Sequence, residues 1–306
     1  MDRRIKFRHL DAFSAIARAR SFKLAAEHLS LTQPAISKTL KELEDILGVV
    51  LMERSRSGVA LTSEGEIFLQ FAEQSTAALR HGLRSLHAGT GASGKLKVGA
   101  LPSVASTLLP DVVLAFASRN PDTLVELYEG PHNDLTARLR SGSLDLVVGR
   151  LGKPDLMVGL SFQQLYAEEV VVVAAPDSPA AHVRDFAALN AFRVLYPPKD
   201  SAIRPLVARL LISQGVPLFS NRIETASPAF GRAVTLADPG TVWVISKGVV
   251  AKDIAAGTLV PLRLDMDATR GSVGIMRRAE EVQSAATTAF SKALSKMCET
   301  LGAPPV

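Results

Sequence analysis

The residues best suited to contacting nucleic acid lie close together between positions 32 and 41. Thr32 is a predicted N-cap, and Pro34 is tolerated in the first turn of the helix that follows it. A helix N-terminus also favours a bound anion such as a phosphate. Side chains that can hydrogen-bond base edges or phosphates lie on the polar face of this helix, and with Pro34 we predict that they form a base-reading surface: Gln33, Ser37, Lys38 and Lys41.

A second basic group follows this helix. Arg54 and Arg56 lie in a predicted turn, 54–58, between short strands expected at 49–53 and 59–61. Guanidinium groups at such a tip could reach phosphates or the minor groove. Residues 1–60 contain 11 Lys and Arg against 7 Asp and Glu, a net charge of +4 out of +5 for the chain. Both observations predict double-stranded DNA as a partner.

Three short helices must position these side chains. Apolar spacing predicts helices over 7–19 and 22–29, and a third that ends at Gly48. The third helix has one apolar face, formed by Ile36, Leu40, Leu43 and Leu47. Two helices joined by a short turn, the second well capped, are typical of a helix-turn-helix.

A longer helix is predicted over about 64–87. Its apolar stripe contains Phe68, Phe71, Ala72, Leu79, Leu83 and Leu86. A stripe of this length predicts pairing with the same helix of a second copy. The segment 89–94 is a Gly-rich linker that also spells G-x-G-x-x-G. It follows a helix rather than a strand, so we exclude dinucleotide binding.

Beyond residue 94, strands and helices alternate, which predicts an α/β fold with parallel sheets. Ligands bind such folds at the carboxyl ends of strands and at helix N-termini. Polar and cationic residues at these places could bind a small anionic or hydroxylated effector: Ser103, His132, Lys199, Ser201, Arg204 and Ser227.

Other classes of protein find little support. The sequence contains no G-x-S-x-G, G-x-x-x-x-G-K-[ST] or H-E-x-x-H motif, and its six histidines are scattered, so we expect no enzyme, no cofactor and no metal site. No apolar run approaches the 20 or so residues that a membrane helix needs. The single cysteine and the charged N-terminus, without a signal peptide, favour a cytoplasmic location over that of a secreted solute-binding protein.

The stretches 21–27, 31–38 and 43–48, with Arg54 and 61–65, resemble the LysR-type transcriptional regulators. Lys38 and Met52 depart mildly from the residues common there, Arg and Phe. The resemblance implies a winged helix-turn-helix over 1–62, a dimerising linker helix and hinge over 63–94, and a periplasmic-binding-protein-like effector domain over 95–306. It further implies that subdomain I comprises 95–167 and 268–306, that subdomain II comprises 168–267, and that the protein is a homotetramer that binds promoter DNA.

Two details, residues 2–10 and 54–59, look similar to LysR-type regulators of protocatechuate catabolic operons. That resemblance implies an acidic aromatic catabolite, such as a carboxymuconate, as the effector. A sister group that resembles the chain less senses sugars such as galactose or arabinose, and this alternative stays open. RNA polymerase is a further candidate partner. The sequence does not distinguish activation from repression.

Overall fold

The computed structural model of the 306-residue chain describes residues 4–55, 58–88, 94–279 and 281–300. These residues divide into two compact units, which are described in turn. The first contains mainly residues before Ala92, and the second contains most of the remainder.

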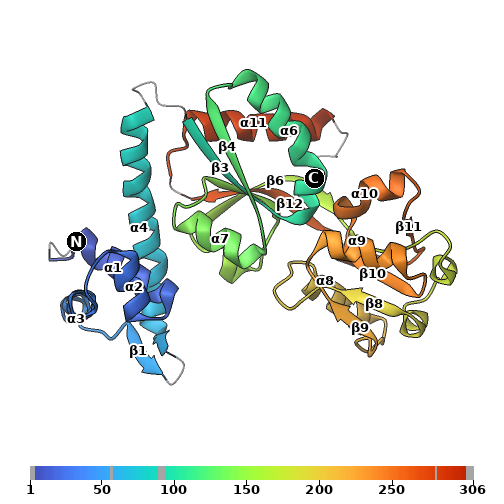
Figure 1. Cartoon of the computed structure of the whole chain (residues 1–306), viewed down its shortest axis with the longest axis horizontal. Helices are drawn as coiled ribbons and strands as arrows, with labels where there is room; N and C mark the ends of the chain where they lie inside the picture. The colour runs from blue at the N-terminus through green and yellow to red at the C-terminus, as the bar shows by residue number, and fades with distance from the viewer. Residues whose placement is uncertain (1–3, 56–57, 89–93, 280, 301–306) are drawn as a thin grey trace. The chain divides into compact units, whose positions relative to one another are not determined.

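The first unit begins with a trihelical core and a hairpin (Figure 1). Its elements are α1 (Phe7–Ala19), α2 (Phe22–His28), α3 (Gln33–Leu47), β1 (Met52–Ser55) and β2 (Gly58–Leu61). All three predicted helices are present. The hairpin strand β1 begins three residues later than the sequence predicted, because the amides of Leu51 and of Met52, its first residue, bond to Glu44 of α3.

The long helix α4 (Ser63–Ala88) follows, close to the predicted bounds. The ring of Phe68 packs edge-on against Phe13 of α1, with the ring centroids 5.5 Å apart, and Ala72 is buried in the same core. Phe71, by contrast, is 60% exposed, and Leu79 and Leu83 are each about half exposed. The predicted apolar stripe is therefore split between packing on its own unit and an exposed face.

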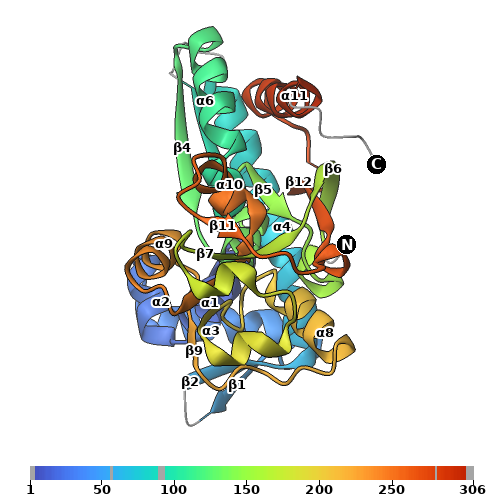
Figure 2. The same ribbon diagram turned by 90° about the vertical axis from the view of Figure 1, so that its right-hand side faces the viewer.

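The second unit contains two mixed sheets of five strands each (Figure 1). The first sheet has the order β4-β3-β5-β12-β6. These strands are Thr123–Glu129, Gly94–Ala100, Leu146–Arg150, Gly271–Arg278 and Leu160–Glu168. Helices α5 (Pro102–Ser106), α6 (Leu108–Arg119), α7 (His132–Arg140) and α11 (Ala285–Thr300) accompany them, and Figures 1 and 2 both show α6 beside α11.

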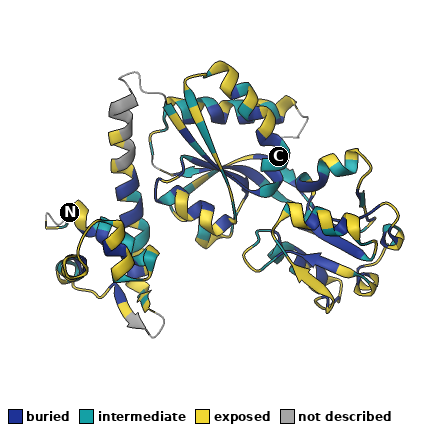
Figure 3. Cartoon of the chain, viewed as in Figure 1, coloured by how far each residue is buried: buried dark blue, intermediate teal, exposed yellow. Residues whose placement is uncertain are grey.

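The second sheet has the order β11-β7-β10-β8-β9. Its strands are Val260–Pro261, Val170–Ala174, Thr241–Ser246, Arg193–Tyr196 and Arg222–Glu224, accompanied by α8 (Arg204–Ser213), α9 (Pro228–Ala237) and α10 (Lys247–Ala255). Apolar side chains cover both faces of this sheet, which is why its central strands are buried (Figure 3). We call each sheet with its helices a lobe, the first-sheet lobe and the second-sheet lobe.

The α/β fold class predicted from the sequence is confirmed, with one correction to the sheets. Parallel pairing holds for β3 with β4 and β5, and for β8 with β9 and β10. However, β12 runs antiparallel to β5, and β7 runs antiparallel to β10. The sequence analysis did not predict β6, β11 or β12. The chain leaves the first sheet after Glu168 and returns to it at Gly271, so two crossovers join the lobes.

Candidate nucleic-acid interface and effector cavity

The N-terminus of α3 has the capped geometry that the sequence predicted. The Thr32 hydroxyl accepts a hydrogen bond from the Ala35 amide at 3.4 Å, and Gly48 ends the helix with φ +71°. Ile36, Leu40 and Leu43 are buried beneath the helix. Gln33, Pro34, Lys38 and Lys41 are exposed, and Ser37 is half-buried. The structure thus places all five predicted base-reading residues on the accessible side of α3.

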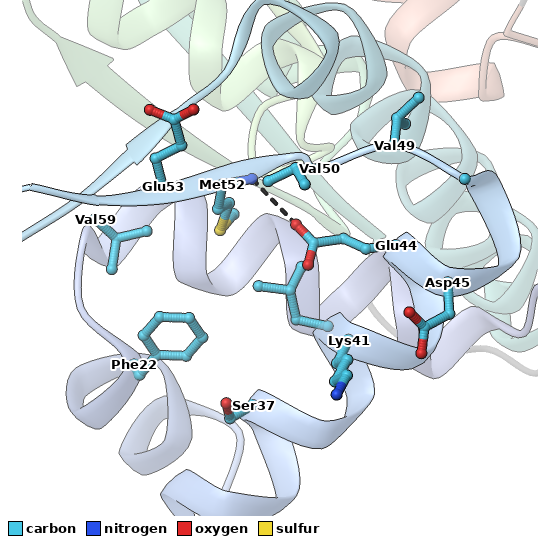
Figure 4. Close-up of a pocket in the computed structure, with 12 residues that line it drawn as sticks. Phe22, Ser37, Lys41, Glu44, Asp45, Val49, Val50, Met52, Glu53 and Val59 are labelled. Carbon is cyan, nitrogen blue, oxygen red and sulfur yellow. Dashed lines mark hydrogen bonds between the residues drawn. The ribbon is translucent and has the colours of Figure 1, made fainter.

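A groove separates α3 from the hairpin. Ser37 and Lys41 line one side of it, and Phe22, Val50 and Val59 line the other parts (Figure 4). One oxygen of the Glu44 carboxylate accepts hydrogen bonds from the backbone amides of Leu51 at 2.8 Å and Met52 at 3.2 Å. Glu44 therefore fixes the start of β1 relative to α3, and with it the direction in which the hairpin extends.

The hairpin itself pairs in register, with Arg54 opposite Val59 and Ser55 opposite Gly58. Arg54 belongs to β1 rather than to the turn, so the predicted turn at 54–58 was too long. Arg56 lies outside the described residues. The backbone nonetheless places Arg54 near the tip of a two-stranded hairpin, which is where the sequence analysis expected a basic wing.

The second unit contains a cavity of about 350 Å³ lined by residues of both lobes. It brings together four of the six predicted effector residues, Ser103, His132, Ser201 and Ser227. They come from the starts of α5 and α7, the loop after β8 and the N-cap of α9. Four residues selected by the carboxyl-end rule thus line one cavity, and their contact with an effector stays a prediction. Its apolar wall contains Leu101, Ile203, Ile245 and Val249.

Two of these polar residues are almost completely buried. Ser103 is 5% exposed and His132 is 3% exposed. The His132 ring packs directly on the backbone of Gly152, where an added Cβ would approach Cε1 to 2.2 Å. Ser227 caps α9 by accepting a hydrogen bond from the Phe230 amide at 3.2 Å, and its hydroxyl proton can still be donated to a ligand.

Neither Lys199 nor Arg204, both predicted to contact the effector, lines the cavity. Lys199 is exposed in its loop. The Arg204 guanidinium forms an ion pair with Glu224 at 2.8 Å and donates to the Pro197 carbonyl at 2.9 Å. It also lies 5.2 Å from the centre of the Tyr196 ring. These partners satisfy Arg204 away from the ligand space.

The cation that does line the cavity is Arg150, which the sequence analysis missed. It is the last residue of β5 and is 3% exposed. Its Nη2 lies 3.5 Å from the carboxylate of Glu168, and its Nη1 donates to the Thr269 carbonyl at 3.3 Å. Burial lowers the pKa of Arg150, although the adjacent Glu168 opposes this effect. Arg150 lies at the carboxyl end of a strand, but the sequence alone does not show that its side chain is buried beside a carboxylate.

The described residues contain no cluster of three or more His, Cys, Asp or Glu side chains that could hold a metal ion. Within the same ranges, no helix has the length and hydropathy needed to cross a membrane.

Comparison with known proteins agrees with both halves of this architecture. Residues 7–66 match the bacterial regulatory helix-turn-helix protein family of the lysR type, and residues 89–299 match the LysR substrate binding domain. The HTH-type transcriptional regulator PcaQ of Agrobacterium fabrum is 42% identical over 283 residues, which cover 92% of this chain and 91% of PcaQ.

Solved structures show the same fold. A full-length OxyR variant from Pseudomonas aeruginosa is 24% identical with a TM-score of 0.62, covering 95% of this chain and 97% of that one. Full-length CbnR in complex with its target DNA is 25% identical with a TM-score of 0.51, covering 96% and 100%. From the two domain matches and the identity to PcaQ, the chain belongs to the LysR family of bacterial transcriptional regulators, whose members are regulators rather than enzymes.

Proposed function

We propose that this regulator binds promoter DNA through the exposed end of α3 and the hairpin wing. Gln33, Ser37, Lys38 and Lys41 would contact base edges and phosphates in the major groove, with Pro34 at the start of the helix. Arg54 and Arg56 would contact phosphates or the minor groove. The exposure of the α3 side chains and the crystal structure of CbnR with its target DNA support this assignment.

We further propose that a small carboxylate is the effector, in particular an aromatic-acid catabolite such as a protocatechuate-pathway carboxymuconate. The observation that carries this proposal is the buried Arg150 in the wall of the cavity. A buried guanidinium beside hydroxyl groups suits a carboxylate, because such charge-assisted bonds are strong and geometrically specific. The identity to PcaQ over most of both chains also supports an effector of this class.

The proposed domain division follows the sequence prediction: 1–62 for DNA binding, 63–94 for the linker and 95–306 for the effector. We assign its two subdomains to the two lobes. This assignment is supported by the strand ranges, since the first sheet takes strands from 94–168 and 271–278 and the second from 170–261. The exposed Phe71, Leu79 and Leu83 of α4 would pair with a second copy, as a step toward a homotetramer. We infer that the assembly works in the cytoplasm, where RNA polymerase is a further partner.

In the proposed mechanism, the effector changes how far the two lobes close on the cavity, and this alters how the assembled DNA-binding units engage the promoter. Effector and DNA must then influence each other's affinity by the same factor. A ligand that bound both states of the regulator equally well would switch nothing.

A thermal-shift panel tests the effector class directly. The purified full chain would be heated with protocatechuate, carboxymuconate, benzoate, catechol, galactose and arabinose. A ligand at 100 times its Kd adds about 2.7 kcal/mol of stability, which is easily detected. The proposal predicts a shift with at least one acid and none with either sugar. A shift with sugars alone would refute the carboxylate assignment in favour of the sugar alternative.

A further inference from the structure

Glu168 is the last residue of β6, where the chain leaves the first sheet, and its side chain is almost completely buried. One carboxylate oxygen lies 3.5 Å from Nη2 of Arg150. The other accepts a hydrogen bond from the Gly248 amide at 2.9 Å. A single buried anion thus holds two partners, Arg150 and Gly248, at one crossover.

Residues of both lobes meet at this carboxylate. Ser103 lies on α5 of the first-sheet lobe, and Gly248 lies at the start of α10 of the second-sheet lobe. The approach of α10 is close, because a Cβ added to Gly248 would lie 2.4 Å from Glu168 Oε1 and 3.0 Å from the Ser103 carbonyl oxygen. Glu168 therefore bonds to α10 at the point where α10 packs against α5, so a change at its carboxylate acts at a contact between the two lobes.

Arg150 connects this anion to the ligand cavity. It faces the cavity, whereas Glu168 does not line it. Nη1 is used by Thr269 at the second crossover, and the Thr269 hydroxyl in turn accepts from the Val170 amide at 3.0 Å just after the first crossover. The buried Nε has no hydrogen-bond partner among the described residues. Arg150 thus has one donor without a partner among the described residues, while Glu168 neutralises its charge.

We propose that Glu168 is the positioning residue that couples the cavity to lobe closure: a carboxylate effector competes with Glu168 for Arg150, and the weakened Glu168 contacts allow α5 and α10 to change their spacing. This inference rests on the proposed function, because it requires an anionic effector in the cavity. It assigns a role to a residue outside the cavity, which contacts the effector only through Arg150.

The physical basis is that one guanidinium cannot fully compensate two buried carboxylates. Each carboxylate loses its hydration, and the two repel each other across Arg150. In the effector-free protein, burial already raises the pKa of Glu168 while Arg150 acts to lower it. An anion that draws Arg150 toward the cavity removes this compensation. Binding of the effector and the negative charge on Glu168 are therefore unfavourable to each other.

The isosteric substitution Glu168→Gln tests this opposition. It removes the charge and keeps an oxygen that can accept from Gly248. Because the buried Arg150 is then no longer neutralised, the inference predicts that acids of the panel bind about 10-fold more tightly than to the wild type. Binding of catechol, which lacks the carboxylate of protocatechuate, should not change. Glu224→Gln is the matched control, because it removes the acid of the Arg204–Glu224 pair outside the cavity.

Titration calorimetry with protocatechuate and carboxymuconate would be combined with promoter binding in the presence and absence of acid. Tighter acid binding by Glu168→Gln, with a reduced effect of acid on DNA affinity, supports the inference. Unchanged or weaker acid binding by that variant refutes it, while acid binding by the wild type would leave the proposed function standing. Absence of acid binding by the wild type would count against both.

If Glu168→Gln fails to fold, two further variants carry the test. Glu168→Asp keeps the charge and shortens the side chain, so acid affinity should stay close to that of the wild type. The double variant Arg150→Met with Glu168→Gln leaves no unpaired charge and should lose acid binding by 10-fold or more. Acid binding by the double variant equal to that of the wild type would overturn the role of Arg150 as well.

Discussion

The substitution Glu44→Ala should detach the wing from the recognition helix. The Glu44 carboxylate accepts two backbone hydrogen bonds, from Leu51 and Met52, which fix the start of the hairpin. Figure 4 shows the bond from Met52. A hydrogen bond to a charged group contributes about 1.5–3 kcal/mol net. The two bonds share one oxygen on a half-buried side chain, so we expect each bond to contribute near the lower end of that range. The free energy of unfolding should therefore fall by about 3 kcal/mol in total.

The same substitution should weaken promoter binding. Without Glu44, the hairpin can leave the position that aligns Arg54 with α3, and ordering it on the DNA then costs free energy. We expect DNA affinity to fall by about 10-fold, as for a loss of roughly 1.4 kcal/mol. Urea denaturation of the full chain and fluorescence anisotropy with an operator duplex, obtained by selection from random duplexes, measure the two effects.

Glu44→Gln is the matched control for this prediction. Its amide oxygen can still accept from Leu51 and Met52, but without the negative charge, so both losses should be smaller than for Glu44→Ala. Neither change alters a predicted DNA contact on α3, and the helix should remain folded. The reasoning would be refuted if Glu44→Ala retained both the stability and the DNA affinity of the wild type.

Three further predictions concern the DNA surface, the cavity and the packing of α9 on β10. Ser37→Ala and Lys38→Ala should each weaken operator binding, by about 1–3 kcal/mol where a base contact is lost, and gel retardation showing no change in either variant would remove α3 from the proposed interface. Ser103→Ala should weaken acid binding in calorimetry by about 10-fold, whereas Arg204→Met should not, since Arg204 is paired with Glu224. A larger loss of acid affinity in Arg204→Met than in Ser103→Ala would instead support Arg204 as an effector contact. Gly231→Ala should destabilise the chain by about 1–3 kcal/mol in urea denaturation, because its Cβ would lie 2.4 Å from the Trp243 ring, and unchanged stability would show that α9 can shift away from β10.

The sequence was most informative where structure is local. The Thr32 cap, the apolar face of α3 and the glycine at its end depend on residues a few positions apart, and the structure reproduces them. The carboxyl-end rule likewise located four cavity residues, because strand ends and helix starts can be recognised locally. Bounds of the long helix α4 were also close to those predicted.

Features that depend on distant pairing were not predictable. Strand β12 joins the first sheet more than 100 residues after β5, and its irregular burial pattern gives no alternation to recognise. From the sequence, Arg204 at the start of its helix was expected to bind the effector. Its ion-pair partner Glu224 lies 20 residues later, on a strand that runs parallel to β8. Arg150 was missed because a buried cation is plausible only once Glu168 is known to neutralise it.

The central claim is that occupancy of the cavity changes the binding of DNA. The most direct measurement is the anisotropy of a labelled operator duplex titrated with the full-length regulator, with and without saturating carboxymuconate or the most strongly bound acid of the panel. The account predicts a change in operator Kd of at least 5-fold, or a shifted footprint, and an equal change in acid affinity when DNA is bound. An acid that saturates the cavity and leaves operator Kd, footprint and transcription unchanged would contradict it.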